Sequence, residues 1–348
     1  MTAEELLKSV TKIGAVSGDE FRLSHLLKDI FDEFGHEVFM DNIGNIILKI
    51  NGKKNSQKAM IFSHIDEPGL IVTNIDDKGF LDFDIVGDIN PKDLASQEVL
   101  VWGKKTVPGL LGLRPPHILS AKERKAPVTL EEMKIDIGFS KEKAKKYVNI
   151  GDTVTFKRRC MSFKDDTICA KALCDRIGIP VLYKTLLALK DIDMELYVVF
   201  GVQHYNSFIG ATVAANEVKP DIALILDSVS SKTREDKLNK IQSGFGPAIY
   251  SGPTADSKLT KWLIKCAKNI EYDFKYQIKA ASGKNPTDAW AIQIACGGIP
   301  TAILLTPVMY KYSSAEIVKN IDLDYTSKLL LNFIYFLDKK DWGELSCF

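Results

Sequence analysis

A histidine followed two residues later by a carboxylate ends one of the first apolar runs of this chain. The apolar residues 59–62 lead into Ser63 and His64, and Asp66 follows. Ligands bind just beyond the carboxyl ends of the strands in a mostly parallel sheet. One nitrogen of His64 placed there can bind a metal ion while Asp66 holds the other nitrogen and fixes the tautomer. Alone the pattern is weak evidence, because a histidine after a strand is more often structural.

Other predicted strands and one predicted helix carry side chains that can bind metals or transfer protons. His204 and Tyr205 follow the predicted strand 196–200, and Asp227 follows the predicted strand 222–226. Tyr312 lies beyond the predicted strand 302–305, and Cys174 precedes a predicted helix. Titratable groups that converge at strand ends indicate a binding or catalytic site.

The elements that must position these residues alternate between helices and strands. Thr2 and Glu5 are spaced as a capping box at the start of a first helix. Helical periodicity covers residues 2–13 and 23–34, a turn at 41–45 separates two short strands, and a last helix covers 322–337. Asp288 is expected to cap a helix over 289–295. Short strands separated by Gly, Pro and charged turns fill residues 71–163. We therefore expect an α/β domain (1–70 plus 164–348) with a central mixed, mostly parallel sheet flanked by helices, and an inserted β-rich domain (71–163).

The composition limits the kinds of partner and the cellular location that we expect for this protein. The chain has 348 residues, 45% of them hydrophobic, and 46 Lys and Arg against 45 Asp and Glu. This balance favours peptides or small molecules as partners, without nucleic acid or a membrane. The N-terminus does not read as a signal peptide, which predicts a cytoplasmic protein. The six cysteines form no Cys-x-x-Cys pair, so reduced thiols are expected.

Motifs along nearly the whole chain resemble one family, the tetrahedral or deblocking aminopeptidases. This is the glutamyl-aminopeptidase-like family M42 of cytoplasmic enzymes with two zinc or cobalt ions. The similar segments are Ser17 to Glu20, Asp41 to Asn45, His64 to Gly69, Pro108 to His117, Asp136 to Gly138, Asp175 to Gly178, Pro286 to Ala289 and Gly298 to Thr301. The resemblance implies a zinc-aminopeptidase-like domain with a barrel-like insertion that supports assembly into dodecamers.

The same resemblance assigns roles to the site positions. The family holds one metal with a histidine, a bridging aspartate and a second aspartate, which correspond to His64, Cys174 and Asp227. The bridging aspartate, a glutamate and a histidine hold the second metal. The last two of these ligands correspond to Tyr205 and Tyr312. The glutamate that acts as general base corresponds to His204.

These replacements predict that the second metal site is lost. Tyrosine is a poor zinc ligand, because its unperturbed pKa is about 10. Imidazole, thiolate and carboxylate can all bind zinc, so one zinc or cobalt ion at His64, Cys174 and Asp227 remains possible, with Asp66 orienting His64. The thiol of Cys174 can equally be a buried apolar side chain, in which case no metal is held.

Three functions remain open. The first is a homologue of metallo-aminopeptidases that is weakly active or non-catalytic. The second is a mononuclear zinc hydrolase or aminopeptidase with His204 as general base. The third is a peptide-binding protein or an assembly partner of an active relative.

Overall fold

The computed structural model describes residues 1–53, 57–113, 129–232, 241–283 and 287–345. His117, Cys347 and the loop residues Lys284 to Pro286 lie outside these ranges. Five described cysteines are free.

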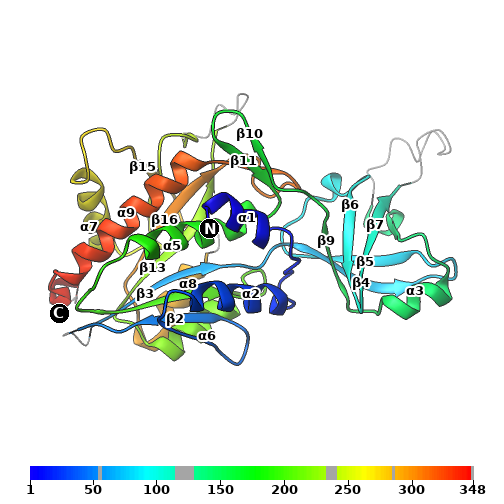
Figure 1. The fold of residues 1–348 in the computed structure, drawn as a ribbon, viewed down its shortest axis with the longest axis horizontal. Helices are drawn as coiled ribbons and strands as arrows, with labels where there is room; N and C mark the ends of the chain where they lie inside the picture. Colours follow the sequence, from blue (N-terminus) through cyan, green and yellow to red (C-terminus); the bar gives the residue numbers. More distant parts are fainter. Residues whose placement is uncertain (54–56, 114–128, 233–240, 284–286, 346–348) are drawn as a thin grey trace.

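The larger part of the molecule is built on an eight-stranded mixed sheet. Its strands are β1 (Glu37–Met40), β2 (Ile46–Ile50), β3 (Lys58–His64), β12 (Glu195–Gly201), β13 (Ile222–Ser230), β14 (Ala248–Ser251), β15 (Gln277–Ala280) and β16 (Thr301–Val308). The order is β1-β2-β12-β3-β13-β16-β14-β15. Figure 1 labels β2, β3, β13, β16 and β15 of this sheet. The neighbouring strands β12, β3, β13 and β16 are parallel, so their carboxyl ends lie at one edge of the sheet.

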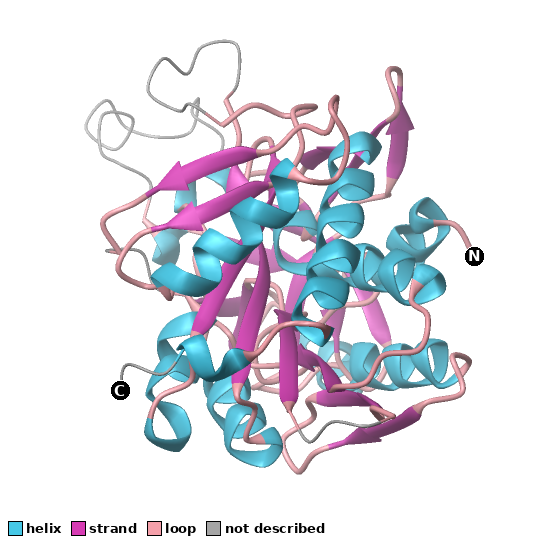
Figure 2. Ribbon diagram, turned by 90° about the vertical axis from the view of Figure 1, so that its left-hand side faces the viewer, coloured by secondary structure: helices cyan, strands magenta, loops and turns pink. Residues whose placement is uncertain are grey.

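Helices cover both faces of this sheet. They are α1 (Ala3–Val10), α2 (Phe21–Asp32), α4 (Leu173–Arg176), α5 (Gly178–Ala188), α6 (Ile209–Val218), α7 (Ser257–Lys268), α8 (Asp288–Ile294) and α9 (Asn320–Asp338). Because side chains alternate along a strand, Ile46 and Leu48 join one core with α1, α2, α5, α7 and α9, whereas Ile47 joins a second core with α6 and α8. The rotated view shows helices on either side of the strands (Figure 2).

The first helix begins as the sequence predicts. The Thr2 hydroxyl accepts a hydrogen bond from the Glu5 backbone N–H at 3.1 Å, and the Glu5 carboxylate accepts one from the Thr2 N–H at 2.7 Å. This reciprocal capping box satisfies two backbone donors at the start of α1. Leu6 and Val10 are then fully buried against the sheet domain.

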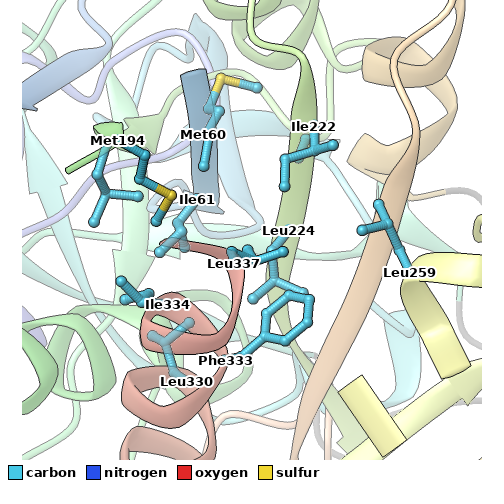
Figure 3. Close-up of a pocket in the computed structure, with 13 residues that line it drawn as sticks. Met60, Ile61, Met194, Ile222, Leu224, Leu259, Leu330, Phe333, Ile334 and Leu337 are labelled. Atoms are coloured by element: carbon cyan, nitrogen blue, oxygen red, sulfur yellow. The ribbon is translucent and has the colours of Figure 1, made fainter. Parts of the chain in front are cut away.

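The core beneath α9 is closely packed. Leu330, Phe333 and Ile334 of α9 face Ile61 and Leu224 of the sheet (Figure 3). The space left between them is only about 10 Å³ and is lined by apolar side chains. That is about the smallest space in which one water fits, so this gap is not a ligand site.

A closed six-stranded barrel follows directly on the sheet strand that ends at His64. Its strands are β4 (Gly69–Ile75), β5 (Leu81–Val86), β6 (Glu98–Trp102), β7 (Thr106–Gly112), β8 (Lys134–Asp136) and β9 (Thr153–Phe156), with helix α3 (Lys141–Tyr147) beside them. The barrel has its own hydrophobic core and lies at one side of the larger part, on the right in Figure 1. A β-rich insertion is thus confirmed, while its boundaries at residues 71 and 163 stay a prediction.

A small three-stranded sheet brings together two chain segments that carry predicted site residues. It consists of β10 (Met161–Phe163), β11 (Thr167–Ala170) and β17 (Glu316–Lys319), all antiparallel. Ala170 pairs with Glu316 in this sheet. The pairing brings the segment that carries Cys174 next to the segment that carries Tyr312.

Candidate active-site cavity

Five of the predicted site residues line one cavity at the carboxyl edge of the central strands, whereas Cys174 and Asp66 are buried outside its lining. The cavity has a volume of about 270 Å³. His64 comes from the end of β3, His204 and Tyr205 from the turn after β12, Asp227 from β13, and Tyr312 from the segment after β16. Two placements differ from the sequence interpretation. β13 runs on to Ser230, so Asp227 lies within this strand, and Cys174 lies within α4 rather than before it.

His64 is held by buried carboxylates. It is 3% exposed, and its Nδ1 lies 3.5 Å from an oxygen of Asp66, which is fully buried. Burial lowers the pKa of His64, but the contact with Asp66 and the charges of Asp288 and Asp227 outweigh this effect and raise the pKa to about 10. These carboxylates favour the protonated form of the His64 ring.

His204 stacks on His64 and is oriented by a carboxylate that the sequence did not indicate for this role. The two ring centroids are 3.9 Å apart and the planes differ by 15°. His204 Nδ1 lies 2.8 Å from Oδ2 of Asp288, which is 1% exposed. The expected role of Asp288 as a helix cap is wrong: α8 starts at Asp288 itself, Thr287 is its N-cap residue, and no side chain caps it. The carboxylate of Asp288 instead contacts Nδ1 of His204.

His64, His204 and Asp288 form a cluster whose ligand atoms all lie within 4.8 Å of one another, and no other such group occurs in the described ranges. The residue types suit zinc, but the geometry does not. A zinc ion binds imidazole about 2.0–2.1 Å from the nitrogen and near the plane of the ring. Two stacked rings cannot both meet this condition for one ion. As the rings lie, the cluster does not fit a metal ion.

Cys174 is buried beside the cavity, and the neighbouring buried residue Asp175 lines it. The backbone N–H of Cys174 donates to Glu316 Oε2 at 2.7 Å. Burial and the charges of Asp175 and Glu316 raise the pKa of the Cys174 thiol well above its usual value, so the thiolate that zinc requires is disfavoured. Burial also raises the pKa of Glu316, to about 7.

Tyr205, which the sequence predicts to stand at a lost-ligand position, makes a specific contact. Its hydroxyl donates to Oδ1 of Asp175 at 2.7 Å, while Oδ2 of Asp175 has no hydrogen-bond partner among the described residues. Burial and the charge of Asp175 raise the pKa of the Tyr205 hydroxyl well above its ordinary value. The phenol therefore stays protonated and acts as a donor rather than as a ligand.

The side chain of Lys311 places a positive charge beside Asp227 in the cavity. Its ammonium lies 3.9 Å from Asp227 Oδ1 and donates to the Ser228 carbonyl at 3.2 Å. Burial lowers the pKa of Lys311, but the charge of Asp227 outweighs it, and the pKa is raised above its usual value. The neighbouring residues Tyr310 and Tyr312 both have positive φ, 57° and 70°. These rarely adopted conformations turn the segment so that Lys311 and Tyr312 both line the cavity.

The observed cluster of side chains differs from the predicted set of metal ligands. The structure brings His64 together with His204 and Asp288 rather than placing it in one tight cluster with Cys174 and Asp227. The three-residue site of His64, Cys174 and Asp227 stays a prediction. Sequence reasoning missed the contributions of Asp288 and Lys311. A signal for Lys311 existed, because this basic residue directly precedes Tyr312, a predicted lost-ligand position.

Glu20 adds a pH-dependent element next to the site. It accepts hydrogen bonds from the backbone N–H groups of Gly18 and Gln203, which directly precedes His204. Burial, and then the charge of Asp66, raise the pKa of Glu20 to about 7.

The raised pKa predicts an effect of Glu20→Gln on stability. The folded chain binds more protons than the unfolded chain between about pH 4.5 and 7, so stability falls as pH rises through this window. Glutamine keeps the acceptor oxygen and carries no charge. We expect the variant to lose this pH dependence and to gain on the order of 2 kcal/mol at pH 8. Urea unfolding of both proteins at pH 5 and pH 8 measures the difference, and an equal pH dependence in the two proteins would refute it.

Comparison with known proteins places the chain in a family. A family model described as M42 glutamyl aminopeptidase matches residues 44–329. A putative aminopeptidase of Acetivibrio thermocellus is 35% identical, over 95% of this chain and 98% of that protein. The lysyl aminopeptidase of Pyrococcus furiosus is 29% identical, over 93% of this chain and 94% of that protein. The chain belongs to the M42 glutamyl aminopeptidase family, whose members are metal-dependent aminopeptidases.

Solved structures agree with this assignment. The TET aminopeptidase of Thaumarchaeota archaeon SCGC AB-539-E09 matches with a TM-score of 0.92 at 26% identity, covering 99% of each chain. The TET1 peptidase of Pyrococcus horikoshii, which can assemble into a tetrahedron or a large octahedral shell, matches with a TM-score of 0.84 at 27% identity, covering 96% of this chain and 99% of the other. The fold expected from the sequence, a helix-flanked mixed sheet with an inserted barrel, is thereby confirmed.

Proposed function

We propose that this M42 homologue has exchanged its two-metal centre for side chains of its own, so that it binds peptides and hydrolyses them weakly or not at all. The observation that carries this proposal is the Lys311 ammonium 3.9 Å from Asp227. A second metal ion in this family needs carboxylate and imidazole ligands, and the matching positions are Tyr205 and Tyr312. The residues present do not fit two ions.

Charge balance supports the same conclusion. Asp66, Asp175 and Asp227 are acidic side chains at or beside the cavity, and Asp227 corresponds to a metal ligand of the family. Here the cations beside them are the His64 ring and Lys311. Buried charges need such partners, because an unpaired buried charge is costly. The side chains thus supply positive charge without any bound ion.

In a second candidate function, the protein still hydrolyses peptides. It uses at most one zinc or cobalt ion, at His64, Cys174 and Asp227, with His204 as the general base. The observation in its favour is the 2.8 Å contact between His204 and Asp288, since a base held by a carboxylate is a recurrent catalytic arrangement. In that case Nε2 of His204 accepts a proton from water while Asp288 holds Nδ1–H. A single bound zinc would lower the pKa of its water towards 7.

One assay separates the two candidates. We expect aminoacyl p-nitroanilides to be hydrolysed at a rate that changes less than about twofold between buffers with chelator and with zinc, and between wild type and His204→Ala. General acid–base catalysis typically contributes 10²–10⁴-fold. A loss of about 100-fold or more in His204→Ala, or with chelator, would establish the second candidate and overturn the first.

The remaining proposals concern oligomeric assembly and cellular location. The TET relatives form closed shells, and we propose that this chain also forms homo-oligomers, alone or with an active relative. None of the described helices combines the length and the apolar character that crossing a membrane requires. A cytoplasmic location stays part of the proposal.

A further inference from the structure

One wall of the cavity carries polar side chains that the site chemistry does not use. Lys279, Tyr250, Thr254 and Thr287 all line the cavity. Lys279 and Tyr250 come from neighbouring strands β15 and β14, Thr254 from the loop after β14, and Thr287 from the residue before α8. We call these four residues the polar wall.

The hydroxyl groups of the polar wall lack partners among the residues that the structure describes. The side-chain oxygens of Tyr250, Thr254 and Thr287 are buried and make no hydrogen bond with any described residue. Tyr250 and Thr254 are each only 9% exposed. A buried polar group without a partner costs about 1–3 kcal/mol. Three such groups on one cavity, none of them paired with a described residue, are available to a bound ligand.

Lys279 gives this wall its charge. Tyr250 and Lys279 are paired across the parallel strands β14 and β15, so their side chains leave the sheet on the same face. Lys279 has no carboxylate within ion-pair distance in the described part of the chain. The lining carboxylates Asp175 and Asp227 come from α4 and β13, and Asp227 already lies beside Lys311.

An ammonium and three hydroxyl donors suit a carboxylate, which only accepts hydrogen bonds. An ammonium ligand would face Lys279 with a like charge. The apolar side chains of Ile303 and Leu305 line the same cavity and suit the methylene groups of such a ligand. Family membership does not decide the charge of the ligand, because the family model is described as glutamyl and the Pyrococcus furiosus relative is a lysyl aminopeptidase.

We propose that the polar wall is a carboxylate-binding subsite, which takes the acidic side chain of a peptide whose first residue is Glu or Asp. This rests on the proposed function only in placing a peptide in the cavity. It needs no metal ion and no hydrolysis. Lys279 is then the residue that determines the charge preference.

Peptide titration tests the subsite directly. The full chain is titrated by calorimetry, in chelator, with Glu-Ala-Ala-Ala, Gln-Ala-Ala-Ala and Lys-Ala-Ala-Ala. Hydrogen bonds to charged groups contribute more than neutral ones, and we expect the Glu peptide to bind about 10-fold more tightly than the Gln peptide, and the Lys peptide most weakly. Lys279→Met should abolish the difference between Glu and Gln. Tyr250→Phe and Thr254→Val should each reduce it without removing it.

A matched control is Lys261→Met, which removes an exposed lysine of α7 outside the cavity. It should keep the full preference. Equal affinity for the Glu and Gln peptides, an unchanged preference in Lys279→Met, or no binding of any peptide at millimolar concentration would each overturn the proposal. Turnover in the same samples reports separately on the proposed function, because metal-dependent hydrolysis would refute that function and leave the preference readable.

Discussion

Glu67→Gln is expected to lower the free energy of unfolding by about 3–5 kcal/mol at pH 7, since it leaves buried cations without their counter-ion. Both oxygens of Glu67 accept from Lys171 at 2.5 Å, and Oε1 also accepts from Arg176 at 2.8 Å. All three side chains are at most 3% exposed. Glutamine has nearly the same shape but no charge, so the loss measures the missing counter-charge.

The position of Arg176 makes this network important for the fold. Its guanidinium donates to the carbonyl of Ile65 at 3.1 Å and to the carbonyls of Val10 and Ile13 at 2.8 and 2.9 Å. It therefore ties the end of α1 to the segment between His64 and Asp66. Weakening the network should loosen the segment that carries these two site residues.

The pH dependence of Glu67→Gln provides an internal check. Burial lowers the pKa of Lys171 to about 8, despite the opposing charge of Glu67. A folded-state pKa below the unfolded value means that stability rises with pH between the two values. Without Glu67 this pKa should fall further, so the variant should regain part of its stability towards pH 9. Chemical denaturation at pH 7 and pH 9 measures this, with Glu217→Gln, an exposed glutamate of α6, as the control that stays within about 0.5 kcal/mol of wild type. A loss below 1 kcal/mol in Glu67→Gln would contradict this account.

Lys311→Met is expected to convert the site into one that binds metal ions. Without the ammonium, Asp227 loses the cation beside it, and we expect the unfolding free energy in chelator to fall by about 1–3 kcal/mol, less than for a fully buried pair because both side chains are partly exposed. A divalent ion should then occupy the vacated position. An ion at 100 times its dissociation constant stabilises a protein by about 2.7 kcal/mol.

Thermal unfolding with and without zinc or cobalt measures this conversion. The metal should raise the stability of Lys311→Met clearly more than that of wild type. Lys279→Met is the matched control, because it removes another lysine from the same cavity without touching Asp227. If zinc stabilises Lys311→Met and wild type equally, Lys311 does not stand in for a metal ion.

Most of the fold could be predicted from the sequence. Local patterns predicted the capping box at Thr2, the strand that ends at His64 and the turn that carries His204, and each follows from residues close together in the chain. The motif matches gave the barrel insertion, which composition alone would have left as a β-rich region. The extension of β13 to Ser230 was missed, since Asp and Ser disfavour strands locally and pairing with β16 overrides that preference.

The positions of the site residues could be predicted from the sequence, but the residues that they contact could not. The sequence indicated His64, His204, Tyr205, Asp227 and Tyr312, and all of them line the cavity. It could not pair His204 with Asp288, which is 84 residues away, because such contacts depend on how α8 packs against the turn after β12. The contact between the Cys174 backbone and Glu316 arises in the same way, from the pairing of β11 with β17.

The most direct test of the central claim is the metal content of wild-type chain purified without chelator, incubated with zinc or cobalt and desalted. Elemental mass spectrometry gives equivalents of metal per chain. We expect at most one, because Tyr205, Tyr312 and Lys311 occupy the surroundings of the second ion. Two equivalents per chain would contradict the replacement of the two-metal centre and restore ordinary two-metal hydrolysis as the function.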